Sequence, residues 1–544
     1  MRHLKYLVCA GAIYLALTLA GQWGQGSWQD EFGGHADEAS HYVTGLMARD
    51  YVAGGFPGSP MHFAERYYLH YPKVAPGPWP PLFYGAQLPW LLLFEPARAQ
   101  LMLFMALQTV LLAFLTFALA TRLLGRPAGF LAGLLLLGFP LVRQYGSMLM
   151  PDMLHALLCL AAAVCYGRFL DSERKRDALG FALLAAAAIL NKGSAIGLAL
   201  VPPLGLALTG RWYLLRRFSF WLPALAVLVL CAPWYWVAFP MMTNGFEHPQ
   251  SLAGSLRAVL FYSRGLLRYF GPVLLFLAGW GAAAGLRSAR RPGWWAALTA
   301  LVLAVPLFHC LVTNAHDGRY LLPVFPAVLI LMLNGARRVL ILCRRKRGPW
   351  PARLLVGLSL ALLLGARFAF PPRLLGGSGF GMPAADLLAD SKADGQAWLV
   401  SSDARGEGMF VAQVAMREQR RPTHFALRAS KMLADSSWDG QDYQALFSTP
   451  GDLRDFLLAS PVGVILLDTT MPPDRRVPHH ALLERTLRDF PRDFNLLNTY
   501  PLTRDGIFYP KGLLVYRVAG RSTMTQLELE ASLERILRRR VPDR

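Results

Sequence analysis

A short stretch near the start of the chain, HADEASHYVTGLMARDYV from His35 to Val52, is dense in groups that can do chemistry. Asp37 and Glu38 are adjacent acids, and His35 and His41 flank them. A carboxylate in such a place can take a proton from a hydroxyl group, a step that typically contributes a factor of about 10²–10⁴ to a rate. The sequence therefore points to Asp37 and Glu38 as candidate catalytic residues.

The same stretch allows two other interpretations. The apolar residues after Asp37 fall at helical spacing, which predicts a helix lying along a membrane surface, and Asp37 alone would then be an ordinary helix cap. His35 and His41 are candidate ligands, together with Glu38, for a divalent cation. Oxygen-rich coordination would favour magnesium or manganese, and histidine would favour zinc. The competing interpretation is that these residues are solvated groups of a surface helix.

Three more charged residues stand at the ends of apolar segments. Asp152, in SMLMPDMLHALL, begins such a segment directly after a proline, where a carboxylate is costly unless it has a function. Lys192, in ILNKGSAIG, sits between two short apolar halves, and Arg319, in NAHDGRYLLPVFP, precedes another segment. The plain alternatives are a helix cap, a lysine that snorkels to the interface, and a salt bridge from Arg319 to Asp317.

The composition is that of a polytopic membrane protein. Of 544 residues, 54% are hydrophobic and only 16% are charged. The formal net charge of +21 does not predict a nucleic-acid partner, because most basic residues sit between apolar segments, as the positive-inside rule requires. The six cysteines all lie in or beside apolar segments, so neither a disulfide framework nor a metal-ligand spacing is predicted.

The apolar segments predict an α-helical protein with about eleven crossings and a first span that is retained rather than cleaved. The predicted crossings are 4–22, 99–121, 128–145, 153–170, 178–190, 194–208, 218–239, 266–286, 294–312, 320–341 and 354–370. The basic turns between alternate pairs should face the cytoplasm. They are 122–126, 171–176, 211–217, 287–291 and 344–348.

Segment 80–94, PPLFYGAQLPWLLLF, is short and bracketed by prolines, so we expect a re-entrant or juxtamembrane helix. If this segment were counted as a crossing, every basic turn would lie on the outer face of the membrane, against the positive-inside rule. With this register, the N-terminus is cytoplasmic. The outer face then receives loop 23–79, the turns around Asp152, Lys192 and Arg319, the loop 240–265, and everything after residue 370.

The C-terminal part has the composition of a soluble α/β domain. Strand-like runs AWLVSS, THFALRA, VGVILLD and GLLVYRV alternate with helical stretches, which predicts a small domain with a largely parallel sheet. We predict a transmembrane domain over 1–370 that includes the first outer loop 23–79, a linker over 371–383 and a periplasmic domain over 384–544. By position, this last domain is expected to bind an acceptor glycan or a partner protein.

Two acids and two cations on one predicted face form a plausible interfacial active site. The chemistry that fits is attack by an acceptor hydroxyl on a sugar carried by a lipid phosphate. A carboxylate takes the hydroxyl proton, while lysine and arginine stabilise the charge that grows on the phosphate. Such a leaving group needs no proton, which argues against a glycosidase, where a carboxylic acid must protonate the departing oxygen.

The order of motifs over roughly residues 1–345 resembles the C-type (GT-C) polytopic glycosyltransferases. The motifs are the acidic pair of the first outer loop, then PPLFYG, MPDMLHALL, NKG and GRYLLPVFP. The resemblance is greatest to the bacterial branch that includes lipid A aminoarabinose transferase and relatives of protein O-mannosyltransferase. It implies a lipid-donor groove formed by the membrane helices.

The resemblance also implies roles for individual residues. Asp37 would be the general base with Glu38 beside it, Asp152 the second acid, and Lys192 and Arg319 the contacts to the donor phosphate. Relatives often carry a compact KPPLFY motif, whereas in YPKVAPGPWPPLFY several residues separate Lys73 from the prolines. The expected role of Lys73 in binding the donor phosphate therefore rests on an imperfect match to the motif.

We therefore expect an inverting glycosyltransferase in a bacterial cytoplasmic membrane. It would move a sugar from a polyprenyl-phosphate donor to a glycan, lipid or protein acceptor at the outer face, among membrane lipids and without nucleic acid. The alternatives are a transporter or flippase, and a non-catalytic scaffold of an envelope polysaccharide system. Charges at the outer ends of the spans, and no evident internal repeat, favour the enzyme.

Overall fold

The computed structural model describes residues 2–75, 77, 79–243, 251–288, 291–312, 316–347, 376–418, 420, 422–435, 443–521 and 523–538. The chain divides into two compact units. The helical unit comprises Met1–Gln25, Gly77–Phe83 and Leu103–Arg373. The mixed unit comprises Gly26–Pro76, Tyr84–Met102 and Leu374–Arg544, so the first outer loop groups with the C-terminal part of the chain.

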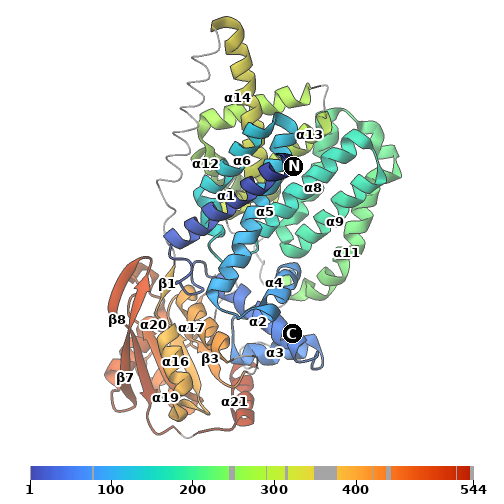
Figure 1. The fold of residues 1–544 in the computed structure, drawn as a ribbon. Coiled ribbons are helices and arrows are strands. Elements are labelled where there is room, and N and C mark those ends of the chain that lie inside the picture. The colour runs from blue at the N-terminus through green and yellow to red at the C-terminus, as the bar shows by residue number, and fades with distance from the viewer. Residues whose placement is uncertain are drawn as a thin grey trace. The chain divides into compact units, whose positions relative to one another are not determined.

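Among the described residues, seven helical segments are long and apolar enough to cross a membrane, and the chain is a multi-pass membrane protein. They are α1 (Arg2–Gly24), α5 (Arg98–Leu124), α8 (Asp152–Ser172), α11 (Phe218–Thr243), α12 (Leu252–Leu286), α13 (Pro292–Leu311), and η3 (Gly318–Val324) continued by α14 (Phe325–Arg347). Shorter helices lie between them: α4 (Leu82–Leu93), α6 (Arg126–Gly138), α7 (Pro140–Tyr145), α9 (Lys175–Asn191), η1 (Gly193–Leu200), α10 (Val201–Thr209) and η2 (Trp212–Arg216). Helices α8, α9 and α11 pack side by side (Figure 1).

The predicted crossings within the described residues correspond to these helices, except that 128–145 is divided between α6 and α7, and 194–208 between η1 and α10. As predicted, segment 80–94 is a short helix. Segment 80–94 forms α4, whose 12 residues span about 18 Å, less than the roughly 30 Å of a bilayer core. The predicted loop 240–265 is helical at both described ends, because α11 continues to Thr243 and α12 begins at Leu252. The predicted crossing 354–370 lies outside the described residues, and the count of eleven stays a prediction.

Glycine allows two long helices to approach closely. A side chain at Gly281 of α12 would meet the carbonyl of Leu331 in α14, and one at Gly335 of α14 would meet the carbonyl of Leu277 in α12. Asn334 of α14 donates a hydrogen bond to the carbonyl of Gly281 over 2.7 Å. Small residues and a buried polar contact are the usual way in which membrane helices associate.

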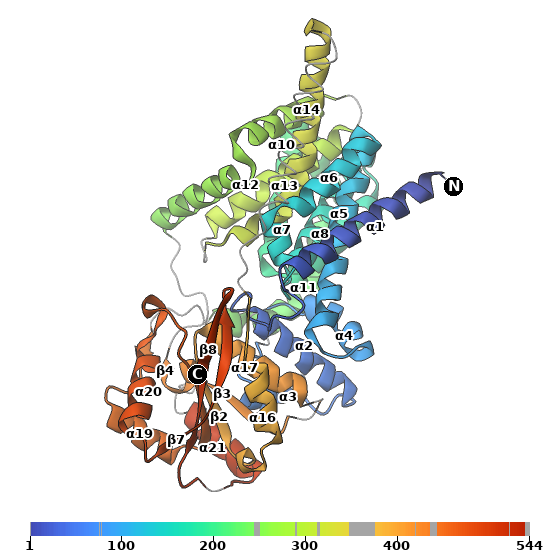
Figure 2. The same cartoon turned by 60° about the vertical axis from the view of Figure 1, so that its left-hand side comes forward.

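The mixed unit contains a six-stranded sheet in the order β1–β7–β8–β6–β2–β3. The strands are β1 (Gly377–Ser378), β2 (Ala397–Ser401), β3 (Phe425–Arg428), β6 (Val462–Asp468), β7 (Phe494–Arg504) and β8 (Ile507–Val518). A two-stranded ribbon pairs β4 (Ala434–Asp435) with β5 (Gln444–Ala445). Helices α16 (Gly381–Ala389) and α17 (Ala404–Arg417) lie on one face of the sheet, and α19 (Pro450–Ala459) and α20 (Pro478–Asp489) on the other (Figure 2).

The α/β class is confirmed, but the prediction of a largely parallel sheet is wrong. Only β3, β2 and β6 are parallel neighbours, whereas β6–β8, β8–β7 and β7–β1 are antiparallel. The unpredicted strand β7 has several exposed residues and lacks a continuous apolar run. It forms a hairpin with β8 through Asp505 and Gly506, both at positive φ, as a tight two-residue turn requires.

The predicted helix of the first outer loop is present as α2 (Glu38–Ala53), followed by α3 (Pro60–His70). Helix α2 packs against α17, and α3 against β3 and α21 (Gln526–Arg538). Because the C-terminal domain covers it, α2 buries polar residues that a helix on an open membrane surface would leave solvated. The composition predicted this loop to be part of the transmembrane domain, whereas it belongs to the mixed unit. The described part of the predicted linker 371–383 contains β1 and the start of α16.

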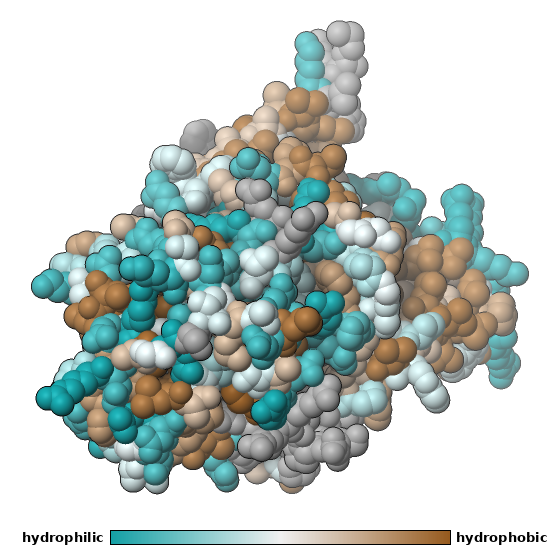
Figure 3. All heavy atoms as spheres, turned by 90° about the horizontal axis from the view of Figure 1, so that it is seen from below, coloured by the Kyte–Doolittle hydropathy of each residue, from teal (hydrophilic) through white to brown (hydrophobic). Residues whose placement is uncertain are grey.

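Part of the exposed surface of the helical unit is apolar. The helical unit exposes large apolar side chains along α11 and α12, among them Leu228, Trp236 and Phe276, as expected for surfaces that face lipid. Figure 3 shows hydrophilic residues over much of one face of the molecule, with hydrophobic residues gathered at its right-hand side. The exposed apolar side chains of α11 and α12 agree with helices that lie in a membrane.

Candidate active site

A buried ion pair joins the start of α8 to the end of α9. Lys192 Nζ lies 2.6 Å from Asp152 Oδ1, and Asn191 Nδ2 donates a hydrogen bond to the carbonyl of Pro151 over 3.1 Å. Asp152 is 1% exposed, and among the described residues its Oδ2 has no hydrogen-bond partner. Lys192 is therefore anchored inside the protein, rather than extended along the surface, and one carboxylate oxygen remains to receive another donor.

Arg319 belongs to the same group of charges. Its Nε lies 3.1 Å from Asp317 Oδ2, and its backbone N–H donates to Asp317 Oδ1, so the salt bridge considered from the sequence is present. Arg319 also lies within electrostatic range of Asp152 and Lys192. The structure therefore brings together three predicted site residues from segments far apart in the sequence.

Two aromatic rings that we did not predict from the sequence, those of Tyr320 and His309, lie beside these charges. The ring of Tyr320 lies 4.9 Å from Lys192 Nζ and 5.5 Å from the Arg319 guanidinium. The ring of His309 in α13 stacks on Tyr320 at 4.6 Å, nearly parallel. Tyr320 follows Arg319 directly in the GRYLLP motif, which could have signalled it, whereas nothing local marks His309. We call Asp152, Lys192, Asp317, Arg319 and Tyr320 the cation cluster.

Asp37 lies in the mixed unit, at the N-cap of α2. Its carboxylate makes no capping hydrogen bond to the first turn of this helix, and its side chain is 26% exposed. The His35 ring accepts a hydrogen bond from the backbone N–H of Asp37, and His35 Nδ1 lies 3.4 Å from Asp37 Oδ2. The Asp37 side chain therefore does not cap the helix, and its carboxylate remains partly accessible to solvent.

Glu38, in contrast, is fully buried and engaged. It accepts hydrogen bonds from the Gly34 N–H over 2.8 Å and from Arg98 Nη1 over 2.9 Å. Arg98 also donates to the carbonyl of Ser27 and lies over the ring of Phe32. The two neighbouring acids thus have different surroundings, because Glu38 belongs to a buried ion pair with Arg98.

Lys73 is buried beside the start of α2. Its Nζ donates a hydrogen bond to the carbonyl of Ala36, the residue before Asp37, over 3.0 Å. Burial, reinforced by the nearby positive charge of Arg428, lowers the pKa of Lys73 to about 7. A Cβ atom added at Gly408 of α17 would lie 2.9 Å from Lys73 Cε, so close packing leaves no room for a side chain there. Lys73 therefore supports the backbone that carries Asp37.

The described residues do not form a metal site of the predicted kind. His41 Nδ1 is hydrogen-bonded to the Tyr84 hydroxyl over 3.0 Å, His35 interacts with Asp37, and Glu38 is paired with Arg98. Within the described ranges, no three His, Cys, Asp or Glu side chains lie together so that they could hold a metal ion. The histidines thus do not fit a shared cation with Glu38.

Comparisons with known proteins agree with this architecture. Residues 80–236 match the family model described as dolichyl-phosphate-mannose-protein mannosyltransferase. A search of curated protein sequences gives no match.

Solved structures resemble most of the chain. The crystal structure of ArnT from Cupriavidus metallidurans bound to undecaprenyl phosphate is 17% identical with a TM-score of 0.54, covering 94% of this chain and 98% of that chain. The Archaeoglobus fulgidus oligosaccharyltransferase in complex with Zn and sulfate is 14% identical, with a TM-score of 0.54 and coverage of 85% and 68%.

The oligosaccharyltransferase AglB from Archaeoglobus fulgidus, in complex with an inhibitory peptide and a dolichol-phosphate, is likewise 14% identical, with a TM-score of 0.53 and coverage of 86% and 69%. At these identities the likeness concerns the fold. The predicted resemblance to the C-type polytopic glycosyltransferases is confirmed at that level.

Proposed function

We propose that this chain is an inverting glycosyltransferase that moves a sugar from a polyprenyl-phosphate donor to a hydroxyl of an envelope glycan, lipid or protein. The reaction would take place at the outer face of a bacterial cytoplasmic membrane. The observation that carries the proposal is the cation cluster, which holds Lys192 and Arg319 in fixed positions at the ends of membrane helices. Two solved structures of the same fold contain undecaprenyl phosphate and dolichol-phosphate, respectively.

On the donor side, Lys192 and Arg319 bind the phosphate. Asp152 and Asp317 hold the two cations, so the site is organised before the substrate arrives. As the bond between sugar and phosphate breaks, its electron pair stays on the phosphate oxygen. Fixed cations in a poorly hydrated site stabilise this growing charge more than water would, and the arginine can donate two parallel hydrogen bonds.

On the acceptor side, Asp37 takes the proton from the attacking hydroxyl. The hydroxyl oxygen bonds to the anomeric carbon from the side opposite the departing phosphate, so a single displacement inverts the configuration. Glu38 with Arg98, and Lys73 through the carbonyl of Ala36, position the first turn of α2. We assign these three to positioning, and Asp37 to catalysis.

No step of this mechanism passes through a metal ion. One solved relative contains Zn, but the described surroundings of His35, Glu38 and His41 do not fit a shared cation.

Binding of undecaprenyl phosphate to the purified full chain tests the donor site. Arg319→Gln and Lys192→Gln should each weaken binding by about tenfold, because each removes a charge-assisted hydrogen bond worth roughly 1.5–3 kcal/mol. The exposed Arg176 at the start of α9 provides the matched control, Arg176→Gln. Unchanged binding by well-folded Arg319→Gln and Lys192→Gln proteins would contradict the donor assignment.

A further inference from the structure

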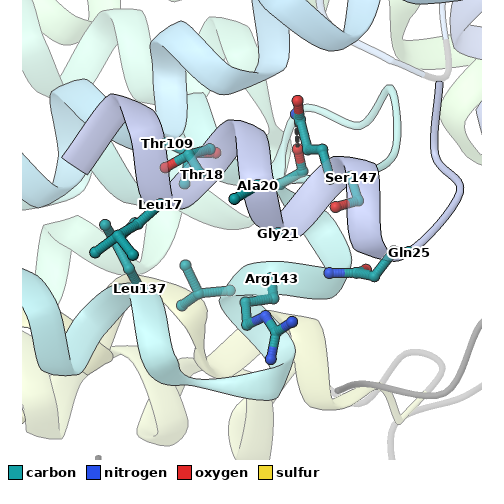
Figure 4. Close-up of a pocket in the computed structure, with 12 residues that line it drawn as sticks. Leu17, Thr18, Ala20, Gly21, Gln25, Thr109, Leu137, Arg143 and Ser147 are labelled. Carbon is teal, nitrogen blue, oxygen red and sulfur yellow. Dashed lines mark hydrogen bonds between the residues drawn. The ribbon is translucent and has the colours of Figure 1, made fainter. Parts of the chain in front are cut away.

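The helical unit contains a pocket of about 210 Å³ that the proposed mechanism does not use. It lies between the second half of α1 and the helices α5, α6 and α7 (Figure 4). An engineered apolar cavity of about 150 Å³ is large enough to bind benzene, so this pocket has room for part of a ligand rather than a few stray waters. Neither Lys192 nor Arg319 is among its described lining residues.

One end of the pocket is polar and favours an anion. Gln25 is 5% exposed, and within the described part of the chain its side-chain Nε2 is buried with no hydrogen-bond partner. Arg143 of α7 adds a positive charge, and none of the described lining residues is acidic. A buried donor that lacks an acceptor is costly, and an anion placed beside Gln25 would accept its hydrogen bond while the guanidinium contributes a favourable charge.

The other end of the pocket is apolar. Leu17 of α1 and Leu137 of α6 lie at one side of the close-up and Gln25 at the other, with Arg143 between them (Figure 4). Leu17 lies seven residues, about 10 Å of helix axis, before the end of α1 at Gly24, and Gln25 follows that end. Since α1 is long and apolar enough to cross a membrane, Leu17 would lie deeper in the bilayer than Gln25 if α1 spans it. This gradient matches a lipid, with a charged head at the interface and carbon chains below.

Helix α7 lies next to both this pocket and the cation cluster. Arg143 lines the pocket, whereas Tyr145, two residues later, lies within electrostatic range of Asp152 and Arg319. The two sites are thus close in the chain but are formed by different side chains.

We propose that the pocket binds the phosphate group of a membrane lipid, with Arg143 and Gln25 at the phosphate and Leu17 and Leu137 along the first carbons of the chain. The phosphate belongs either to a bulk anionic phospholipid or to a polyprenyl phosphate. The inference requires that the helices lie in a membrane, but it does not require the proposed transferase activity.

Lipid retention by the purified full chain tests the proposal. Protein is loaded with phosphatidylglycerol, phosphatidylcholine or undecaprenyl phosphate, and bound lipid is counted by native mass spectrometry. Arg143→Gln should lower the retention of at least one anionic lipid by about tenfold, and the exposed-site control Arg176→Gln should not. Loss of phosphatidylglycerol alone identifies a bulk phospholipid as the source, and loss of undecaprenyl phosphate alone identifies the polyprenyl lipid.

A second pair of variants keeps every polar group in place. An added Cβ at Gly21 would meet Arg143 Nε at an ordinary 3.8 Å, so Gly21→Ala should retain lipid, while the larger side chain of Gly21→Leu should fill the pocket and expel it. The wild type should also prefer phosphatidylglycerol or undecaprenyl phosphate over phosphatidylcholine. Equal retention of all three lipids by the wild type, or unchanged retention by folded Arg143→Gln and Gly21→Leu proteins, would overturn the proposal.

Discussion

Lys192 and Asp152 form an ion pair of 2.6 Å between the end of α9 and the start of α8, with Asp152 1% exposed. Removing one partner leaves a buried charge unpaired. We predict that Asp152→Asn lowers the free energy of unfolding by about 3–5 kcal/mol and that Asp152→Asn combined with Lys192→Met restores part of it. Thermal unfolding of Asp152→Asn, of Lys192→Met and of the double variant in detergent measures this, and a double variant at least as destabilised as Asp152→Asn would contradict the pairing.

The adjacent acids of the first outer loop should respond in opposite ways. Glu38→Gln leaves the Arg98 guanidinium buried without its counter-ion, so we expect a loss of a few kcal/mol in stability. Asp37→Asn should change stability by less than about 0.5 kcal/mol, because the carboxylate makes no capping bond and is partly exposed. Melting curves of the two variants under the same conditions test whether Glu38 has a structural role that Asp37 lacks. Similar losses of stability in both variants would contradict this difference.

Lys73 should give stability a specific pH dependence. Burial lowers its pKa from an ordinary 10.5 to about 7, so between these values the unfolded chain binds a proton that the folded chain does not. The free energy of unfolding contributed by this group therefore rises with pH across that window. Relative to Lys73→Met, the wild type should gain about 2 kcal/mol between pH 7 and pH 9. Parallel denaturation curves at the two pH values test this, and a constant difference would be inconsistent with a neutral buried lysine.

The close approach of α12 and α14 predicts a sharp contrast between two nearby glycines. A side chain at Gly281 would meet backbone atoms of α14, which cannot turn away, whereas one at Gly279 meets nothing within 4 Å. Gly281→Ala should therefore destabilise the helical unit by about 1–3 kcal/mol, and Gly279→Ala should be neutral. Comparison of their melting temperatures checks the packing, and equal effects would show that the helices do not cross there.

Local patterns in the sequence predicted the positions of most elements. The helical spacing after Asp37 predicted α2, and the order of apolar segments and basic turns placed Asp152, Lys192 and Arg319 at corresponding helix ends. The Asp505–Gly506 pair was an available hairpin signal for β7 and β8, but the exposed residues of β7 concealed the strand.

Contacts between distant residues could not be predicted in this way. Arg98 lies 60 residues after Glu38, and α17, which covers α2, lies several hundred residues further along the chain. The burial of Glu38 and Lys73 depends on these tertiary partners, so the sequence alone assigned both residues to catalysis or phosphate binding. Likewise, His309 reaches Tyr320 only through the packing of α13.

The most direct test of the central claim is glycan transfer in membranes from cells that carry Asp37→Asn in place of the wild type. Protein levels are matched, and the native envelope glycan is read by mass spectrometry. We predict that the modification is lost while the variant remains folded and still binds undecaprenyl phosphate, because only the proton acceptor is removed. An unchanged glycan would contradict the role of Asp37 as the base and would favour a transporter or a non-catalytic scaffold instead.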